Sequence, residues 1–90
     1  MINREYLINS EEIQTAIQAI EEFQQKADAI SEESTKRELM DAWHYHGMAQ
    51  EGINQLRTFE LLQGSDYTRF FNNQLRTADK IHALQKGRKL

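Results

Sequence analysis

Residues 13–30 read IQTAIQAIEEFQQKADAI, the clearest helical pattern in the chain. The apolar positions recur at alternating spacings of three and four residues, and they are Ile13, Ala16, Ile20, Phe23, Ala27 and Ile30. This spacing places them along one side of an α-helix. Because the stripe is only about two and a half heptads long, it indicates a helix of a bundle rather than an isolated coiled coil.

Polar residues on either side predict where this first helix begins and ends. Asn9 and Ser10 are both good N-cap residues, and Glu12 would complete a capping box with Asn9. The segment SEES at residues 31–34 is a polar break without glycine or proline. We therefore expect a helix over residues 9–31 and a turn in which Ser31 or Ser34 caps the next helix, with a continuous helix through the break as the alternative.

The rest of the chain predicts two further helices, over residues 34–63 and 65–86. Gly64 is expected to end the second helix in a left-handed conformation, Ser65 or Asp66 to begin the third, and Gly87 to end it. In the third helix the inward position is Leu75 or, alternatively, Gln74. The second helix also contains Gly47 and Gly52, which indicate a close helix contact, a kink or a boundary between two shorter helices.

These patterns predict an all-α fold, a three-helix antiparallel bundle whose middle helix is longer than the others by about two turns. One domain covers residues 1–90, with an N-terminal arm at 1–8 and a basic tail at 87–90. The extra length of the second helix has no partner within the chain, and its apolar residues lie on two sides, so we expect it to pair with a second copy of the chain. The candidate interface of this homodimer consists of Trp43, His46, Ala49, Ile53, Leu56 and Phe59.

Composition excludes several classes of protein. The 90 residues include no cysteine, so a disulfide framework, a thiolate zinc site and a cysteine nucleophile are all excluded. The apolar runs are too short to cross a membrane, and the first residues lack the apolar core of a signal peptide. We therefore expect a cytoplasmic protein without a membrane partner.

Charge is distributed unevenly along the chain. Residues 1–33 contain eight acidic and two basic residues, whereas residues 67–90 contain six basic residues and one acidic residue. The two ends should therefore attract each other, within one chain or between two. The basic side chains of the C-terminal third are the candidate nucleic-acid contacts, namely Arg69, Arg76, Lys80, Lys86, Arg88 and Lys89. The aromatic residues Tyr67, Phe70 and Phe71 lie near them, but the acidic net charge of −3 argues against nucleic acid as the main partner.

Residue motifs for chemistry are absent from the sequence. It contains no glycine-rich phosphate loop, no HExxH and no GxSxG, so we expect no enzyme, no catalytic residue and no cofactor. His44 and His46 are two residues apart, and on a helix they point in different directions, so no metal site is expected. The least favoured reading is a small metal-dependent enzyme that uses His44, His46 and His82.

The function that remains is a small non-enzymatic protein–protein interaction module, a regulator or inhibitor that docks on another protein. Its expected partners are a second copy of the chain and an unidentified protein. In size and composition the chain resembles small accessory proteins of bacteria or their phages, although no motif carries this resemblance. The alternative is a nucleic-acid-binding regulator that uses the basic, aromatic third helix.

Overall fold

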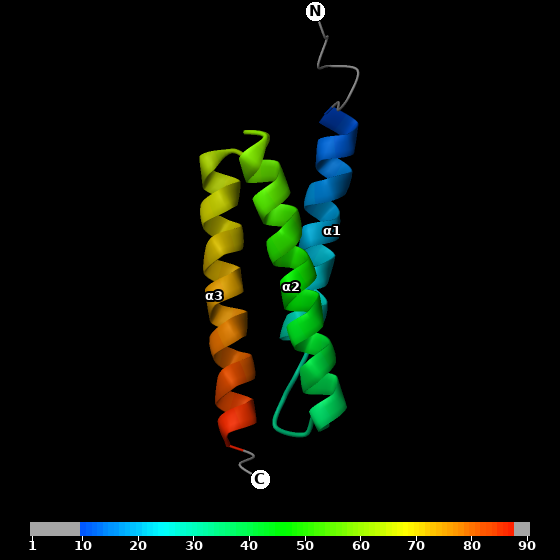
Figure 1. The fold of residues 1–90 in the computed structure, drawn as a ribbon, viewed down its shortest axis with the longest axis vertical. Helices are drawn as coiled ribbons and strands as arrows, with labels where there is room; N and C mark the ends of the chain where they lie inside the picture. Colours follow the sequence, from blue (N-terminus) through cyan, green and yellow to red (C-terminus); the bar gives the residue numbers. More distant parts are fainter. Residues whose placement is uncertain (1–9, 88–90) are drawn as a thin grey trace, which may run out of the picture.

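Three helices make up almost all of the structure. The computed structural model describes residues 10–87, in which α1 spans Ser10–Asp28, α2 spans Lys36–Thr58 and α3 spans Gly64–Lys86. Figure 1 shows the chain running down α1, back up α2 and down α3, with short connections at the two ends. Each helix packs against both of the others. This confirms the all-helical, bundle-like fold.

The middle helix is not the longest. α2 and α3 each have 23 residues and α1 has 19, so the predicted excess of two turns in the middle helix is wrong. The difference arises because α2 begins two residues later and ends five residues earlier than expected. The argument for a dimer from an unpartnered overhang of α2 therefore does not hold.

The start of α2 is fixed by Thr35, not by the predicted serines. The Glu38 N–H donates to Thr35 Oγ1 at 3.0 Å, and the Thr35 N–H donates to Glu38 Oε1 at 2.7 Å, which is a complete capping box. Ser31 and Ser34 hold the preceding turn instead, since the Ser31 N–H donates to Ser34 Oγ at 2.9 Å. The break between α1 and α2 also rules out a continuous helix through this segment.

The end of α2 is formed at Glu60, four residues before the predicted stop at Gly64. Glu60 has a φ of 57°, in the left-handed region. The Leu61 N–H donates to the Leu56 carbonyl at 2.8 Å, and the Glu60 N–H donates to the Arg57 carbonyl at 3.0 Å. This is the Schellman pattern, with Leu61 packed on the same apolar cluster as Leu56. Gly64 is the first residue of α3.

The two glycines of α2 do not interrupt it, because the helix runs unbroken from Lys36 to Thr58. A Cβ atom on Gly52 would lie 2.9 Å from Ile20 Cγ1, so this glycine allows the close approach of α1. Gly47 has nothing within 4 Å of the same position. Of the three predicted roles, the close helix contact is therefore confirmed at Gly52 alone.

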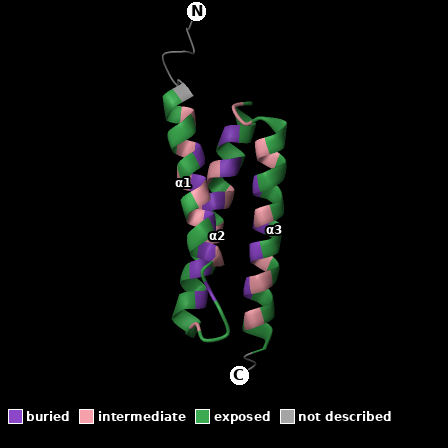
Figure 2. Ribbon diagram, turned by 180° about the vertical axis from the view of Figure 1, so that it is seen from behind, coloured by how far each residue is buried: buried purple, intermediate pink, exposed green. Residues whose placement is uncertain are grey.

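The interior contains two apolar clusters. The larger cluster joins all three helices and is formed by Ile17, Ile20, Ala49, Ile53, Leu56 and Phe70. The smaller cluster, at the other end, contains Ile30, Leu39, Ala42 and Ile81. In Figure 2 the buried positions of α3 lie along the edge that faces the other helices. The predicted apolar stripe of residues 13–30 contributes Ile20 to the larger cluster and Ile30 to the smaller one, as the helical periodicity required.

A polar layer lies between the two clusters. Gln24 Nε2 donates to Gln74 Oε1 at 3.1 Å, and Gln74 Nε2 donates to Gln50 Oε1 and to the His46 carbonyl, both at 3.1 Å. Gln24 and Gln74 are each less than 10% exposed. Buried amides of this kind are tolerated because they satisfy one another. Within the described part of the chain, no buried side-chain nitrogen or oxygen lacks a partner.

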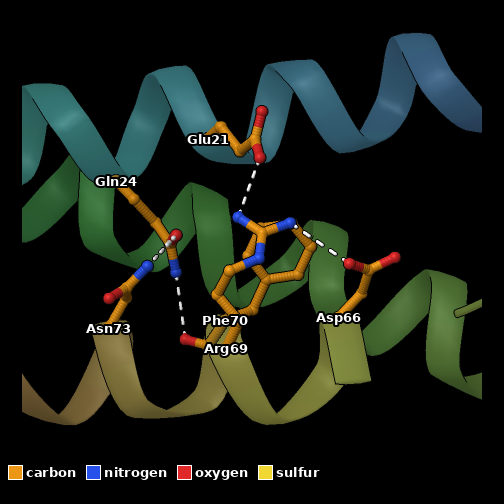
Figure 3. A network of polar contacts seen from close by, with 6 residues as sticks. All are labelled: Glu21, Gln24, Asp66, Arg69, Phe70 and Asn73. Carbon is orange, nitrogen blue, oxygen red and sulfur yellow. Dashed lines mark hydrogen bonds and ion pairs between the residues drawn. The ribbon is translucent and has the colours of Figure 1, made fainter. Parts of the chain in front are cut away.

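Ion pairs bring the acidic first helix onto the basic third helix. Arg69 Nη1 lies 2.8 Å from Glu21 Oε2 of α1, and Arg69 Nη2 lies 3.3 Å from Asp66 Oδ1 of its own helix (Figure 3). Lys80 Nζ lies 3.7 Å from Asp28 Oδ1. The hydrogen bond to Glu21 raises the pKa of the Arg69 guanidinium above its ordinary value. The attraction predicted between the two ends of the chain thus acts within one chain.

Some predictions fall on residues that the structure does not describe. The N-terminal arm at 1–8, the cap at Asn9 and the tail residues 88–90 lie outside the described residues. Across residues 10–87, none of the helices combines the length and apolar character that crossing a membrane requires.

Candidate interaction surface

The α2–α3 pair has one side that α1 covers and one side that it leaves open. On α2, Gly52 lies against Ile20 of α1 and Tyr45 against Phe23. On α3, Asn73 bonds Gln24 of α1 and Thr77 bonds Asp28. At 3.6 residues per turn, the opposite side of each helix is fixed by these contacts. We call that side the open flank, and it consists of Met40, Trp43 and Gly47 of α2 with Phe71, Leu75, Ala78 and His82 of α3.

Large apolar side chains are exposed on the open flank. Met40 is 65% exposed, Leu75 51%, Trp43 46% and Phe71 45%. Single exposed apolar residues are ordinary, but four of them on one side of two adjacent helices are typical of an interaction site. Leu75 is exposed because Gln74 takes the inward position beside it.

Trp43 is held in place by two imidazole rings. Its ring stacks on His46 with centroids 4.9 Å apart, and it meets His82 of α3 edge-on at 5.2 Å. His46 Nε2–H donates to the Gln74 carbonyl at 3.1 Å, which ties the stack to the polar layer. His46 is partly buried, whereas Trp43 is exposed and its ring is fixed by the two contacts. Exposed, well-held aromatic rings are common at interaction hot spots.

Two shallow hollows lie beside these projecting side chains. One, of about 270 Å³, lies between the start of α2 and the end of α3 and is lined by Lys36, Leu39, Met40, Trp43, Ile81, His82 and Gln85. The other follows α2 from Gly47 through Gln50 and Asn54 to Thr58. Its lining is uncharged apart from Glu51 at the edge. The open flank thus combines exposed apolar side chains with shallow hollows and carries few charges.

The predicted interface residues are divided by the fold. Ala49, Ile53 and Leu56 are at most 5% exposed, because they form the interior contacts with α1 and α3. They are therefore unavailable to a second chain, and the expected contact surface must be redrawn. Trp43 lies on the open flank, while Phe59 is exposed at the end of α2. Met40, Phe71 and Leu75 were not predicted as interface residues. Phe71 was named only as an aromatic residue near the candidate nucleic-acid contacts, and Leu75 only as the alternative to Gln74 for the inward position.

The candidate nucleic-acid residues do not form one free basic surface. Arg69 and Lys80 are engaged by the acidic side chains of Glu21, Asp66 and Asp28. Arg69 also lies over the Phe70 ring, with its guanidinium carbon 4.5 Å from the centroid. Arg76 and Lys86 are exposed on α3, whereas Arg88 and Lys89 lie outside the described residues.

The aromatic residues that could stack on bases are also separated. Phe70 is fully buried, Tyr67 is partly buried against Phe71, and Phe71 alone is largely exposed, on the open flank. The exposed ring of Phe71 therefore lies on the opposite side of α3 from Arg69 and Lys80, which face α1.

The histidines do not gather into a metal site. His46 and His82 both contact Trp43, whereas His44 is exposed on the outer surface of α2. Among residues 10–87 no three histidine, cysteine, aspartate or glutamate side chains are close enough together to hold a metal ion. The geometry of the open flank is therefore the main guide to function. Comparison with known proteins identifies no relative, since no family model, no curated protein and no solved structure matches this chain.

Proposed function

We propose that the chain is a non-enzymatic interaction module, a small regulator or inhibitor that acts by docking on another protein chain. The observation that carries this proposal is the open flank, where four large apolar side chains remain about half exposed or more on two adjacent helices. Burying such side chains against a partner is favourable by about 25 cal/mol per Å² of apolar surface.

The interior of the protein supports a binding role over a catalytic one. The buried polar side chains of the described residues are Gln24, Gln74 and Thr77, none of which titrates in the physiological range. Gln24 and Gln74 are engaged by amide and carbonyl partners, and Thr77 lies beside Asp28. Catalytic sites typically hold titratable groups in a cleft, and the open flank presents aromatic and aliphatic side chains instead.

Affinity capture tests the proposal with a matched pair of variants. Leu75→Glu places a charge on the open flank, while Ala83→Glu places the same charge on an exposed position of α3 away from it. Tagged wild type and both variants are used to capture proteins from cells that express the untagged chain. We expect at least one protein, which can include the untagged chain, to be captured by wild type and Ala83→Glu and lost with Leu75→Glu. Equal capture by all three folded proteins would contradict a docking role for this surface.

The nucleic-acid alternative has its own test. Binding of labelled DNA and RNA is followed by fluorescence anisotropy at several salt concentrations, with Arg76→Glu as the variant. The proposed function predicts no binding that depends on Arg76, because the neighbouring cations Arg69 and Lys80 are already paired. Tight binding that weakens steeply with salt and is lost in Arg76→Glu would favour the alternative.

A further inference from the structure

The exposed side chains and hollows of the open flank lie at defined heights along the bundle, where height is counted upward from the start of α2, as in Figure 1. Contacts between α2 and α3 set these heights, since Trp43 meets His82 and Gln50 meets Gln74. Farther up, Arg57 lies over the Tyr67 ring at 5.8 Å. Residue numbers therefore rise along α2 and fall along α3 from the bottom of the bundle to the top, because the two helices run in opposite directions (Figure 1).

In the lower half of the open flank, the large exposed apolar side chains come from α2. Met40 and Trp43 are the exposed apolar side chains there, and the hollow beside them reaches His82 and Gln85 of α3. Ala78, at the upper edge of this half, adds only a methyl group to the surface of α3.

In the upper half the relation is reversed. Phe71 and Leu75 project from α3, while α2 carries the hollow that runs from Gly47 past Gln50 and Asn54. Gly47 weakens the helix relative to alanine, and among residues 10–87 no neighbouring atom comes within 4 Å of the position that a Cβ would take there. A second helix approaching at this point would give the glycine a packing role.

We infer that the open flank binds a second copy of this chain about a two-fold axis parallel to the helices. This operation places α2 of one copy over α3 of the other at the same height. Met40 and Trp43 then face the hollow beside His82, and Phe71 and Leu75 face the hollow at Gly47. Each copy supplies the same contacts to the other, as an isologous interface requires. The inference rests on the proposed function and names the partner chain for the same surface.

Charge also favours a second copy as the occupant. A surface that meets itself brings like charges together, and none of the residues that define the open flank is an aspartate, glutamate, lysine or arginine. Five acidic residues lie on α1, which packs on the opposite side of the α2–α3 pair from the open flank, and they are Glu11, Glu12, Glu21, Glu22 and Asp28. In the inferred dimer the two α1 helices remain outermost, so their negative charges stay apart.

Solution mass tests the second copy. Light scattering coupled to size-exclusion chromatography should give twice the chain mass for wild type and for Ala83→Glu, and the mass of one chain for Leu75→Glu at the same concentration. Circular dichroism checks that Leu75→Glu remains helical, as expected for a residue that is half exposed. A wild-type chain that stays monomeric at several hundred micromolar would overturn the inference.

Cysteine cross-linking tests the arrangement, since the chain has no cysteine of its own. Gly47→Cys and Ala78→Cys are mixed, allowed to exchange subunits and oxidised. The two-fold axis predicts a disulfide-linked dimer in the mixture, and none in either variant alone, because equal positions lie diagonally across the four central helices. A disulfide in Gly47→Cys alone, or none in the mixture, would overturn this arrangement.

The two experiments separate this inference from the proposed function. If wild type is monomeric but Leu75→Glu still loses a captured foreign protein, the open flank is a docking surface and the second copy is wrong. If capture and mass are both unaffected by Leu75→Glu, the proposed function itself fails.

Discussion

The two sides of the α2–α3 pair differ in polarity: the side covered by α1 has paired polar side chains, and the open flank has exposed apolar ones. The covered side meets α1 through the amides of Gln24 and Gln74 and through ion pairs at Arg69 and Lys80. The open flank carries large apolar side chains with few charges. Polar side chains gather where a third helix supplies partners, because an unpaired buried polar group is costly. The open flank lacks such partners within the chain, and its apolar character suits contact with another surface.

Two neighbouring phenylalanines give the largest contrast. Phe70 is fully buried in the larger cluster, so Phe70→Ala should lower the free energy of unfolding by about 3–5 kcal/mol. Phe71→Ala should cost only about 1 kcal/mol, because that ring is nearly half exposed. Urea denaturation in the Leu75→Glu background, where self-association is disrupted, measures both. Equal losses would show that the open flank is as well packed as the interior.

The hydrogen bonds of the polar layer can be removed without changing the open flank. Gln74→Ala removes the acceptor for Gln24 and the donor to Gln50, and it should lower the free energy of unfolding by roughly 1–3 kcal/mol. Asn72→Ala, an exposed position on the same helix, is the matched control and should change it by less than about 0.5 kcal/mol. If the two variants melt alike, the layer contributes little to stability.

The two glycines of α2 sharpen the comparison further. Gly47→Ala should raise the free energy of unfolding by up to about 1 kcal/mol in the Leu75→Glu background, because alanine favours helix and the space there is open. Gly52→Ala should instead lower it by about 1 kcal/mol, since the new methyl group would press on Ile20. Thermal melts of the two variants measure the difference, and a shift of the same sign in both would contradict the close contact of α1 at Gly52.

The smallest effect is expected at Arg69, whose ion pairs are largely solvated. Arg69→Gln should cost about 0.5 kcal/mol, less at high salt. Because the pKa of Arg69 is raised in the folded state, its contribution is fully present below the unfolded value and is lost only as pH rises through the folded value. The difference between wild type and variant should therefore be constant between about pH 6 and 9. A difference that changes across this range would point to another titrating group.

The sequence predicted the number and approximate position of the helices well, because that information is local. Periodicity identified Ile20 and Ala27 of α1 as interior residues, and both are buried. The ends of α2 were predicted less well. Several capping residues were available near each end, and the structure uses Thr35 and Glu60 rather than Ser34 and Gly64. The choice among them depends on where the neighbouring helices hold the connections.

The open flank was the part that periodicity could not identify. Trp43 was named as a candidate for contact, but Ala49, Ile53 and Leu56 were named with it, and these belong to the interior. Apolar residues on two sides of α2 predict two contact surfaces, but they do not indicate which of the two lies inside the chain. The same ambiguity hid the exposure of Leu75, since an apolar residue beside a glutamine is the natural candidate for burial.

The amino-acid sequence by itself determined that this chain forms helices, where each helix has its apolar side, and that its acidic and basic thirds attract each other. These properties depend on residues three or four apart and on net charge, which need no knowledge of the fold. Only the tertiary structure decided that Gln74 is buried and Leu75 exposed. The reason is that Gln24, Gln50 and His46, brought together from two other helices, satisfy the Gln74 amide and make its burial possible.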